Sequence, residues 1–343
     1  MASYDFRKGM LSDLDSKSKK VDNNLSDFEE GKYVFFNKNN LFTLGNGDGK
    51  AEFNKESITN NLHIGQLKLL LSEMQTIIYY MDTTVVKNVV YVGAAHGHHI
   101  YVLAKLFPAL TYHLFDISEG WDKRLYELEN VHINNRYFEE KDIKEWQIKG
   151  EEILFISDIR NLAVGDEEGK QADLEKFEAM VLSDMLMQQD WVEQLKPALA
   201  LLKFRLPYPD VVKKESQTYL DGAVLRQIFA RPSSAETRLL VKGLAYRDWD
   251  LDTYDKMNAY FNRYIRAKGL YFNPINGGKK AIYEKRGLHN DFESTAMTII
   301  AIDYLKKINA IVNETNILKI LDFILDNCYA SRKLNLNAER KMK

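Results

Sequence analysis

Apolar residues form two different patterns along the chain. Between Ile64 and Met81 they recur at intervals of three and four, which predicts an amphipathic helix with its leucines on one face. Strands are predicted at residues 89–92 and 112–115, and the continuous apolar run at 153–156 is typical of a strand buried on both faces of a parallel sheet. Further strands are predicted at residues 131–138, within 197–209 and at 236–241. Strands alternating with helical patterns indicate an α/β protein.

The first of these strands runs into a turn of small residues. Gly93 and Gly97 follow residues 89–92, and a helical pattern begins directly afterwards. Glycine permits torsions and a close ligand approach that a Cβ would obstruct, and open α/β sheets bind ligands at this end of their strands. The spacing Gly-x-x-x-Gly is only part of the dinucleotide fingerprint. A nucleotide-type site and a plain strand-to-helix connection therefore both remain open.

Two of the predicted strands end in an aspartate. Asp116 follows residues 112–115, and Asp158 follows residues 153–157. Asp116 lies roughly twenty positions after the glycine turn, where such folds hold the hydroxyls of a ribose, although a helix N-cap would explain it equally well. We expect both carboxylates on the same edge of the sheet as the glycine turn.

Two lysines stand in unusual surroundings. Lys203 interrupts an apolar run, where an ammonium group is costly to bury unless it is paired. Lys68 lies beside the leucine stripe of the first helix, where a side chain that reaches solvent would be ordinary. A buried, paired lysine is either part of a structural ion pair or a catalytic base, and the pattern alone leaves both open.

Composition narrows the class of protein. The 343 residues suffice for one large domain or two smaller ones. Cys328 is the single cysteine, which excludes an internal disulfide framework, and no Cys/His cluster has the spacing of a metal site. No apolar run has the length of a membrane span, and the polar start lacks the apolar segment of a signal peptide. We therefore expect no metal, no membrane association and a cytosolic location.

The chain divides into three regions by composition. Residues 1–60 are expected to form a polar extension, residues 61–310 the main domain, and residues 311–343 a C-terminal helix and charged tail. A basic stretch from Arg263 to Arg286, interleaved with aromatic residues, would suit contacts with an RNA backbone or simply form a solvated surface. The net charge of −2 does not decide this, because binding depends on the local surface.

Five segments of the chain occur together, in this order, in one known family. They are GQLKLLL at 65–71, the glycine turn, ISDIR at 156–160, LKFRLPYPD at 202–210 and SAETRLL at 234–240. In these segments the chain closely resembles the poxvirus cap-specific mRNA 2′-O-methyltransferases, which also serve as the small regulatory subunit of the viral poly(A) polymerase. The resemblance covers about residues 62–262 and extends weakly to about 310. It leaves residues 1–60 and the tail unmatched, which favours a member from another large DNA virus.

This resemblance implies a fold and a catalytic set. The fold is that of RrmJ/FtsJ-like, S-adenosylmethionine-dependent methyltransferases, a doubly wound, mostly parallel, Rossmann-like sheet. The family's Lys-Asp-Lys-Glu tetrad falls on Lys68, Asp158, Lys203 and Glu236 without substitution. A ribose 2′-hydroxyl is a weak nucleophile, so the enzyme must activate and align it. We expect Lys203 to be the base or proton director, with Asp158 and Glu236 orienting the amines.

The same resemblance implies a binding site for S-adenosylmethionine. The residues that would contact this cofactor are Gln66, Tyr91, Gly93, Gly97, His99, Asp116, Phe138 and Asp158. Two positions depart from the family pattern. His96 stands where the family has Pro, and Ser118 stands where it has an Arg near the adenosine. We expect these departures to alter the local geometry and the affinity for the cofactor.

For the mRNA cap, the family stacks the cationic 7-methylguanine between two aromatic rings and pairs its edge with carboxylates. Tyr208 matches one ring position, and Asp210 and Asp255 match the acids. The second ring is expected in the N-terminal segment, where the candidates are Tyr33, Phe35, Phe36, Phe42 and Phe53.

The sequence thus predicts an enzyme that methylates the 2′-oxygen of the first transcribed nucleotide of m7G-capped mRNA. The alternative is a noncatalytic processivity subunit bound to a poly(A) polymerase catalytic subunit, and one chain could serve both roles. An FtsJ-type rRNA methyltransferase would instead be indifferent to a cap. The expected location is the host cytoplasm or a viral factory. Packaging of the protein in the virion is a further expectation.

Overall fold

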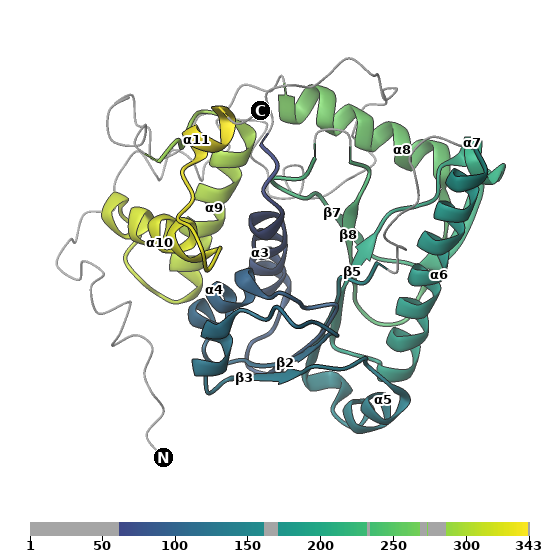
Figure 1. The fold of residues 1–343 in the computed structure, drawn as a ribbon, viewed down its shortest axis with the longest axis horizontal. Helices are drawn as coiled ribbons and strands as arrows, with labels where there is room; N and C mark the ends of the chain where they lie inside the picture. The colour runs from purple at the N-terminus through teal and green to yellow at the C-terminus, as the bar shows by residue number, and fades with distance from the viewer. Residues whose placement is uncertain (1–61, 161–170, 232–233, 268–272, 274–285, 342–343) are drawn as a thin grey trace.

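The computed structural model describes residues 62–160, 171–231, 234–267, 273 and 286–341. Its centre is a seven-stranded sheet in the order β3-β2-β1-β4-β5-β8-β7 (Figure 1). The strands are β1 (Asn88–Val92), β2 (Thr111–Phe115), β3 (Val131–Asn134), β4 (Ile153–Ser157), β5 (Leu199–Phe204), β7 (Ala223–Leu225) and β8 (Thr237–Val241). The five strands from β3 to β5 are parallel, whereas β8 and β7 are antiparallel to their neighbours. A separate pair joins β6 (Ser216–Leu220) and β9 (Tyr246–Asp250).

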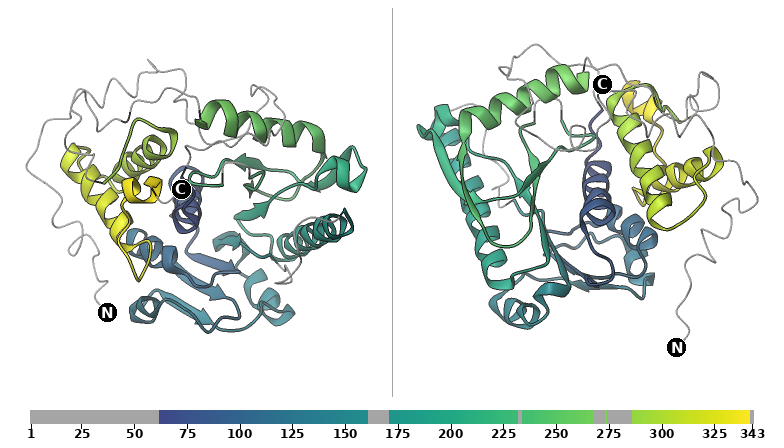
Figure 2. Two further views of the ribbon diagram at one scale, coloured as in Figure 1. Left: turned by 45° about the horizontal axis from the view of Figure 1, so that its top comes forward. Right: turned by 180° about the vertical axis from the view of Figure 1, so that it is seen from behind.

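Helices cover both faces of the sheet (Figures 1 and 2). One face packs against α3 (Gly65–Gln75), α4 (His98–Leu106), α9 (Phe292–Lys307) and α10 (Glu314–Asn327). The other face packs against α5 (Glu140–Gln147) and α6 (Gln171–Leu195). Shorter helices are α7 (Pro209–Val212), α8 (Leu251–Tyr260) and α11 (Leu336–Lys341), with π-helical turns η3 (Thr76–Tyr80) and η6 (Phe261–Arg266) and 3₁₀ turns η4 (Lys123–Glu127) and η5 (Gly150–Glu152). This arrangement confirms the predicted doubly wound, Rossmann-like α/β fold.

The apolar patterns explain the central elements. The leucine stripe of α3, including Leu67, Leu70 and Leu71, is fully buried, as its spacing predicts. All residues of β4 are buried, which is why its sequence is a continuous apolar run rather than an alternating one. From β1 the chain continues to β2 and β3 on one side, and later to β4 and β5 on the other. The strand order therefore reverses at β1 and β4, and such a reversal opens a crevice at the carboxyl ends of the strands.

The third strand is shorter than the sequence predicts. It ends at Asn134 instead of residue 138. Glu139 then caps α5, and its carboxylate forms a capping box with Asp142. Phe138 lies beyond the strand and packs edge-on against Phe115, with ring centroids 5.0 Å apart. Phe138 is therefore a core residue, although its backbone belongs to a loop.

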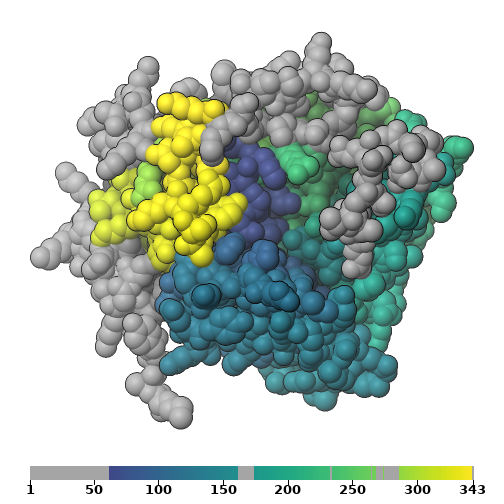
Figure 3. Space-filling model, viewed as in Figure 1, coloured from purple at the N-terminus to yellow at the C-terminus, as the bar shows by residue number. Residues whose placement is uncertain are grey.

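The C-terminal region, expected as a helix and a charged tail, packs against the rest of the protein through its apolar residues. Leu334 and Leu336 are fully buried, and Leu336 begins helix α11. The backbone N–H of Leu334 donates to the carbonyl of Leu325 at 2.8 Å, which ties this segment to the end of α10. In Figure 3 the yellow C-terminal residues lie directly against the purple and blue surface of α3 and α4. These two leucines anchor the segment in the core, and the ion pairs Lys333–Asp326 and Arg340–Asp291 tie its charged residues to the neighbouring elements.

The basic stretch is also partly structural. Arg266 is buried, pairs with Glu293 and donates to the carbonyls of Leu62 and Ala230. Arg286 forms ion pairs with the acids of α10 at positions 322 and 326. These two arginines therefore stabilise the fold and do not present a free basic surface. The lysines of this stretch, Lys268, Lys279, Lys280 and Lys285, lie outside the described residues.

Candidate active site

Four residues from distant parts of the chain meet at the carboxyl edge of the sheet. The Nζ atom of Lys68, on α3, lies 2.6 Å from Oε1 of Glu236. The Nζ atom of Lys203, on β5, lies 3.2 Å from Oδ1 of Asp158 and 3.8 Å from Oε2 of Glu236. Their side chains are between 13% and 18% exposed, so the cluster is reachable from solvent without being freely hydrated. The structure thus brings together the four residues of the tetrad that the resemblance implies.

Strand register explains why these positions converge. Ser157 pairs with Leu202 across the parallel strands β4 and β5, so the next residues, Asp158 and Lys203, lie together at the edge of the sheet. Strand β8 runs in the opposite direction, and its first residue, Thr237, pairs with Phe204. Glu236 therefore lies at the same edge, although it precedes its strand and Asp158 follows one.

A buried arginine that the sequence reading missed completes the cluster. Arg238 is 1% exposed, and its Nη2 lies 2.6 Å from Oδ1 of Asp158, closer than Lys203 does. With its amide in the orientation that satisfies both neighbours, Gln227 donates to Glu236 at 3.3 Å and accepts from Nε of Arg238 at 2.8 Å. The signal in the sequence was the same as for Lys203, because Arg238 also interrupts an apolar strand.

The cations of the cluster keep both carboxylates ionised. Burial by itself would raise the pKa of Asp158, but Arg238, Lys203 and Lys68 outweigh it and hold that pKa well below its ordinary value. Burial opposes ionisation of Glu236 in the same way, yet Lys68, Lys203 and Arg238 lower its pKa to about 2. Desolvation disfavours the charge of Arg238, but Asp158 and Glu236 raise the pKa of its guanidinium. Both carboxylates and the guanidinium of Arg238 are therefore charged at neutral pH.

The glycine turn lies directly beside Asp158. Gly93 has a φ of +80°, and a Cβ there would come within 2.9 Å of the backbone carbon of Asp158. Gly97 has a φ of +73° and precedes α4 as its N-cap. The carboxylate of Asp116 accepts the backbone N–H of Ala95 in the turn at 2.9 Å. Asp116 thus supports the turn, and the helix N-cap considered for it is not what the structure shows.

The other residues assigned to the cofactor differ in accessibility. Gln66 is partly exposed, whereas the side chains of Tyr91 and His99 are 1% and 2% exposed. The hydroxyl of Tyr91 donates to Glu73 at 2.8 Å, inside the layer formed by α3 and α4. Phe138 is also mostly buried. The side chains of Tyr91 and His99 therefore lie in the core and do not reach solvent.

The two departures from the family pattern lie against each other. Oγ of Ser118 is 3.3 Å from Nδ1 of His96. A Cβ at Gly120 would come within 2.5 Å of the same imidazole, so this glycine leaves room for the His96 ring. The peptide bond between Ala95 and His96 is cis. A change at one of these two positions therefore alters the surroundings of the other.

Of the residues assigned to the cap, Tyr208 has the best-defined surroundings. The guanidinium of Arg205 lies 4.6 Å from the centroid of its ring, and buried Glu178 binds both Arg205 and the backbone N–H of Tyr208. One face of the ring is thus covered by a cation. Asp210 is exposed in the first turn of α7, and Asp255 is partly buried on α8. The five N-terminal aromatic candidates lie outside the described residues.

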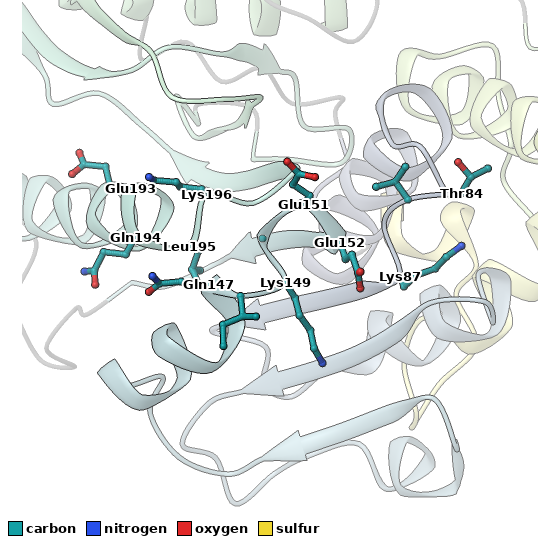
Figure 4. Close-up of a pocket in the computed structure, with 13 residues that line it drawn as sticks. Thr84, Lys87, Gln147, Lys149, Glu151, Glu152, Glu193, Gln194, Leu195 and Lys196 are labelled. Carbon is teal, nitrogen blue, oxygen red and sulfur yellow. The ribbon is translucent and has the colours of Figure 1, made fainter.

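A cavity of about 1110 Å³ lies at the opposite, amino edge of the sheet. Lys87, which precedes β1, and Glu152, which precedes β4, are among its lining residues (Figure 4). Side chains of both charges surround it, and none of the predicted site residues lies there.

Within the described ranges, no cluster of His, Cys, Asp and Glu has the arrangement of a metal site. In the same part of the chain, no helix combines the length and apolar character needed to cross a membrane.

Comparison with known proteins agrees with the geometry. Residues 33–285 match the family model described as poly A polymerase regulatory subunit. The match begins within the N-terminal segment, so part of the region that the resemblance left unmatched belongs to the family as well. A relative from Fowlpox virus (strain NVSL), named cap-specific mRNA (nucleoside-2′-O-)-methyltransferase, is 32% identical over 261 residues, which are 69% of this chain and 77% of the relative. A protein of the same name from Myxoma virus (strain Lausanne) is 30% identical over 240 residues, 64% of this chain and 68% of the relative. The chain therefore belongs to the family of poly(A) polymerase regulatory subunits, whose curated relatives are poxvirus cap-specific mRNA methyltransferases.

Proposed function

We propose that this protein transfers a methyl group from S-adenosylmethionine to the ribose 2′-oxygen of the first transcribed nucleotide of m7G-capped mRNA. The observation that carries the proposal is the contact network of Lys68, Glu236, Lys203 and Asp158 at the carboxyl edge of the sheet. The names of the viral relatives support the same reaction class.

The chemistry requires a group that directs the proton of a weakly acidic hydroxyl. We assign this role to Lys203, whose Nζ is held between two carboxylate oxygens, at 3.2 Å from Asp158 and 3.8 Å from Glu236. Lys68 binds the other oxygen of Glu236 and so fixes the carboxylate in place. The carboxylates stay ionised, which lets them orient the lysine amines throughout the reaction.

The reversal of strand order predicts a crevice beside the tetrad, and we propose that it holds an adenosyl cofactor. Its lining joins a glycine turn, the N-terminus of α4 and Asp116 at the end of β2, which together offer close backbone approach and a carboxylate for ribose hydroxyls. Bound S-adenosylmethionine supplies the methyl group. We place it against Gln66, Gly93, Gly97, Asp116 and Asp158, with Tyr91, His99 and Phe138 behind or beside them.

For the cap, we propose that Tyr208 stacks on the methylated guanine with the ring face that Arg205 leaves open. Asp210 and Asp255 would accept hydrogen bonds from the edge of the base, and an aromatic residue of the N-terminal extension would supply the second ring. A cationic base stacked on π faces and paired with carboxylates is preferred over its neutral, unmethylated form.

A transfer assay with three RNAs tests the proposal. The full chain is given S-adenosylmethionine with a labelled methyl group and a short RNA that bears an m7G cap, an unmethylated guanosine cap or no cap. We expect label at the 2′-oxygen of the first nucleotide of the m7G-capped RNA only. Equal labelling of all three RNAs would support an rRNA-type methyltransferase, and no labelling of any would contradict the proposal.

The family description favours a second role, as a partner of a poly(A) polymerase catalytic subunit. We propose that the chain binds such a subunit, independently of methyl transfer. Co-expression of the two proteins followed by size-exclusion chromatography tests this role. We expect the pair to elute together and the Lys203→Met variant to bind equally well, because the tetrad lies within the crevice. Separate elution of the wild-type proteins would contradict it.

A further inference from the structure

A buried chain of hydrogen bonds runs behind the glycine turn. Glu73 on α3 and His99 on α4 are both 2% exposed. Oε1 of Glu73 accepts the hydroxyl of Tyr91 at 2.8 Å and lies 3.1 Å from Nε2 of His99. At its other end, Nδ1 of His99 lies 2.9 Å from Oε1 of Gln66. These hydrogen bonds therefore connect the buried carboxylate of Glu73, through His99, with the partly exposed side chain of Gln66.

The partners fix which atoms carry protons. The backbone N–H of His99 donates to Oε1 of Gln66 at 3.1 Å, so this atom of the amide must be its oxygen. Nδ1 of His99 faces the same oxygen and must therefore carry a proton. Nε2 faces a carboxylate oxygen, so a proton also lies in that bond, on the imidazole or on the carboxyl group. In either state, Nδ1 of His99 is a donor to Gln66.

This assignment determines what Gln66 offers to a ligand. Its amide oxygen already accepts two hydrogen bonds from His99, one from the backbone and one from the ring. Among the described residues, none accepts a hydrogen bond from its Nε2, and the side chain is partly exposed. The free part of the amide is thus a pure donor.

The structure assigns His99 as a positioning residue, held by Glu73 and Tyr91, that turns the amide of Gln66 so that only its N–H groups face an acceptor atom of the cofactor. This inference rests on the proposed function of the crevice. Burying Glu73 and His99 costs stability, because Oε2 of Glu73 has no hydrogen-bond partner among the described residues. Replacing a buried polar pair with apolar side chains often costs no stability, so we attribute the presence of Glu73 and His99 here to the orientation of Gln66.

A double-mutant cycle on the full chain separates this role from a merely structural one. The measured quantities are the dissociation constant of S-adenosylmethionine, by calorimetry, and the steady-state KM and kcat for methyl transfer. The variants are Gln66→Ala, His99→Phe and the double variant. His113→Phe serves as the matched control, because it makes the same substitution at a histidine on β2 that contacts His132 and Trp146 instead of Gln66.

We expect Gln66→Ala and His99→Phe each to weaken cofactor binding about tenfold, the size of one oriented hydrogen bond, with kcat at saturating cofactor nearly unchanged. The double variant should be no weaker than either single variant, because His99 acts through Gln66. His113→Phe should bind the cofactor like the wild type. Additive losses in the double variant, or wild-type affinity in His99→Phe, would overturn the inference.

A second variant covers the case in which His99→Phe does not fold. Gln66→Glu keeps an oxygen for His99 to bind but replaces the outward N–H donors with an acceptor. We expect it to weaken cofactor binding at least as much as Gln66→Ala, and affinity equal to the wild type would overturn the inference. If the wild-type protein itself binds no S-adenosylmethionine, the proposed function falls together with the role of His99. If the wild type binds S-adenosylmethionine and the variants bind it with the same affinity, the proposed function stands and only the role of His99 is contradicted.

Discussion

At the scale of single residues, the candidate site contains charges placed where apolar residues would be expected. Lys203 and Arg238 both interrupt buried strands, and each binds Asp158. The interruption was visible in the sequence, but its partner was not, because the acid lies in another strand far along the chain. Unusual residues could therefore be recognised from the sequence, whereas their pairing required the register of β4, β5 and β8.

The charged network predicts a specific loss of stability in acid. The pKa of Glu236 is lowered from 4.5 to about 2, because Lys68, Lys203 and Arg238 outweigh its burial. The stabilisation from its carboxylate is therefore complete above about pH 4.5 and is lost as the pH falls toward 2. Between pH 5 and pH 3, the free energy of unfolding of the wild type should fall more steeply than that of Glu236→Gln. Parallel curves in chemical denaturation would contradict the assignment.

The glycine turn gives a second prediction at this scale. Gly93→Ala places a Cβ within 2.9 Å of the Asp158 backbone at a φ of +80°. Gly243→Ala is the matched control, since its φ is +75° but no atom lies within 4 Å of the new Cβ. We expect the control to cost about 1 kcal/mol of unfolding free energy and Gly93→Ala to cost clearly more. Equal costs in urea denaturation would show that the turn has room for a side chain.

At the scale of elements, the order and direction of the strands bring together site residues that no single sequence motif contains. The parallel run from β3 to β5 and the antiparallel β8 bring Asp116, Asp158, Lys203 and Glu236 to one edge. The sequence pattern predicted most of these strands, because each contains a short run rich in apolar residues. It failed for the end of β3, where Phe138 packs into the core from a loop. A core aromatic looks the same in the sequence whether or not its backbone is extended.

The outer strands carry a pH-sensitive contact that is separate from the site. His113 on β2 stacks on His132 of β3, with ring centroids 5.0 Å apart. Burial, together with His132 and Lys149, lowers the pKa of His113 from 6.5 to about 4. Its neutral form is favoured in the folded state, so stability is retained above about pH 6.5 and declines as the pH falls toward 4. His113→Phe should reduce that decline, while the same change at exposed His289 should not. Identical pH profiles for wild type and His113→Phe would contradict this reading.

At the scale of the whole molecule, the C-terminal segment belongs to the core. Leu336 is fully buried beside residues of α10, although the segment is mostly charged and polar. Composition averaged over the tail concealed two leucines that matter individually. We expect Leu336→Ala to lower the free energy of unfolding by about 2–5 kcal/mol and Leu244→Ala, at an exposed position, to change it by less than about 0.5 kcal/mol. Equal effects of the two changes would place the tail outside the cooperative unit.

The central claim is that Lys203 directs the reacting proton within the tetrad. Single-turnover methyl transfer to m7G-capped RNA by the Lys203→Met variant tests it most directly, with Lys144→Met, an exposed lysine on α5, as the control. The account predicts a rate at least about 100-fold below the wild type, with the affinities for S-adenosylmethionine and capped RNA preserved, and a wild-type rate for the control. A Lys203→Met variant that binds both substrates and transfers methyl at the full rate would contradict it.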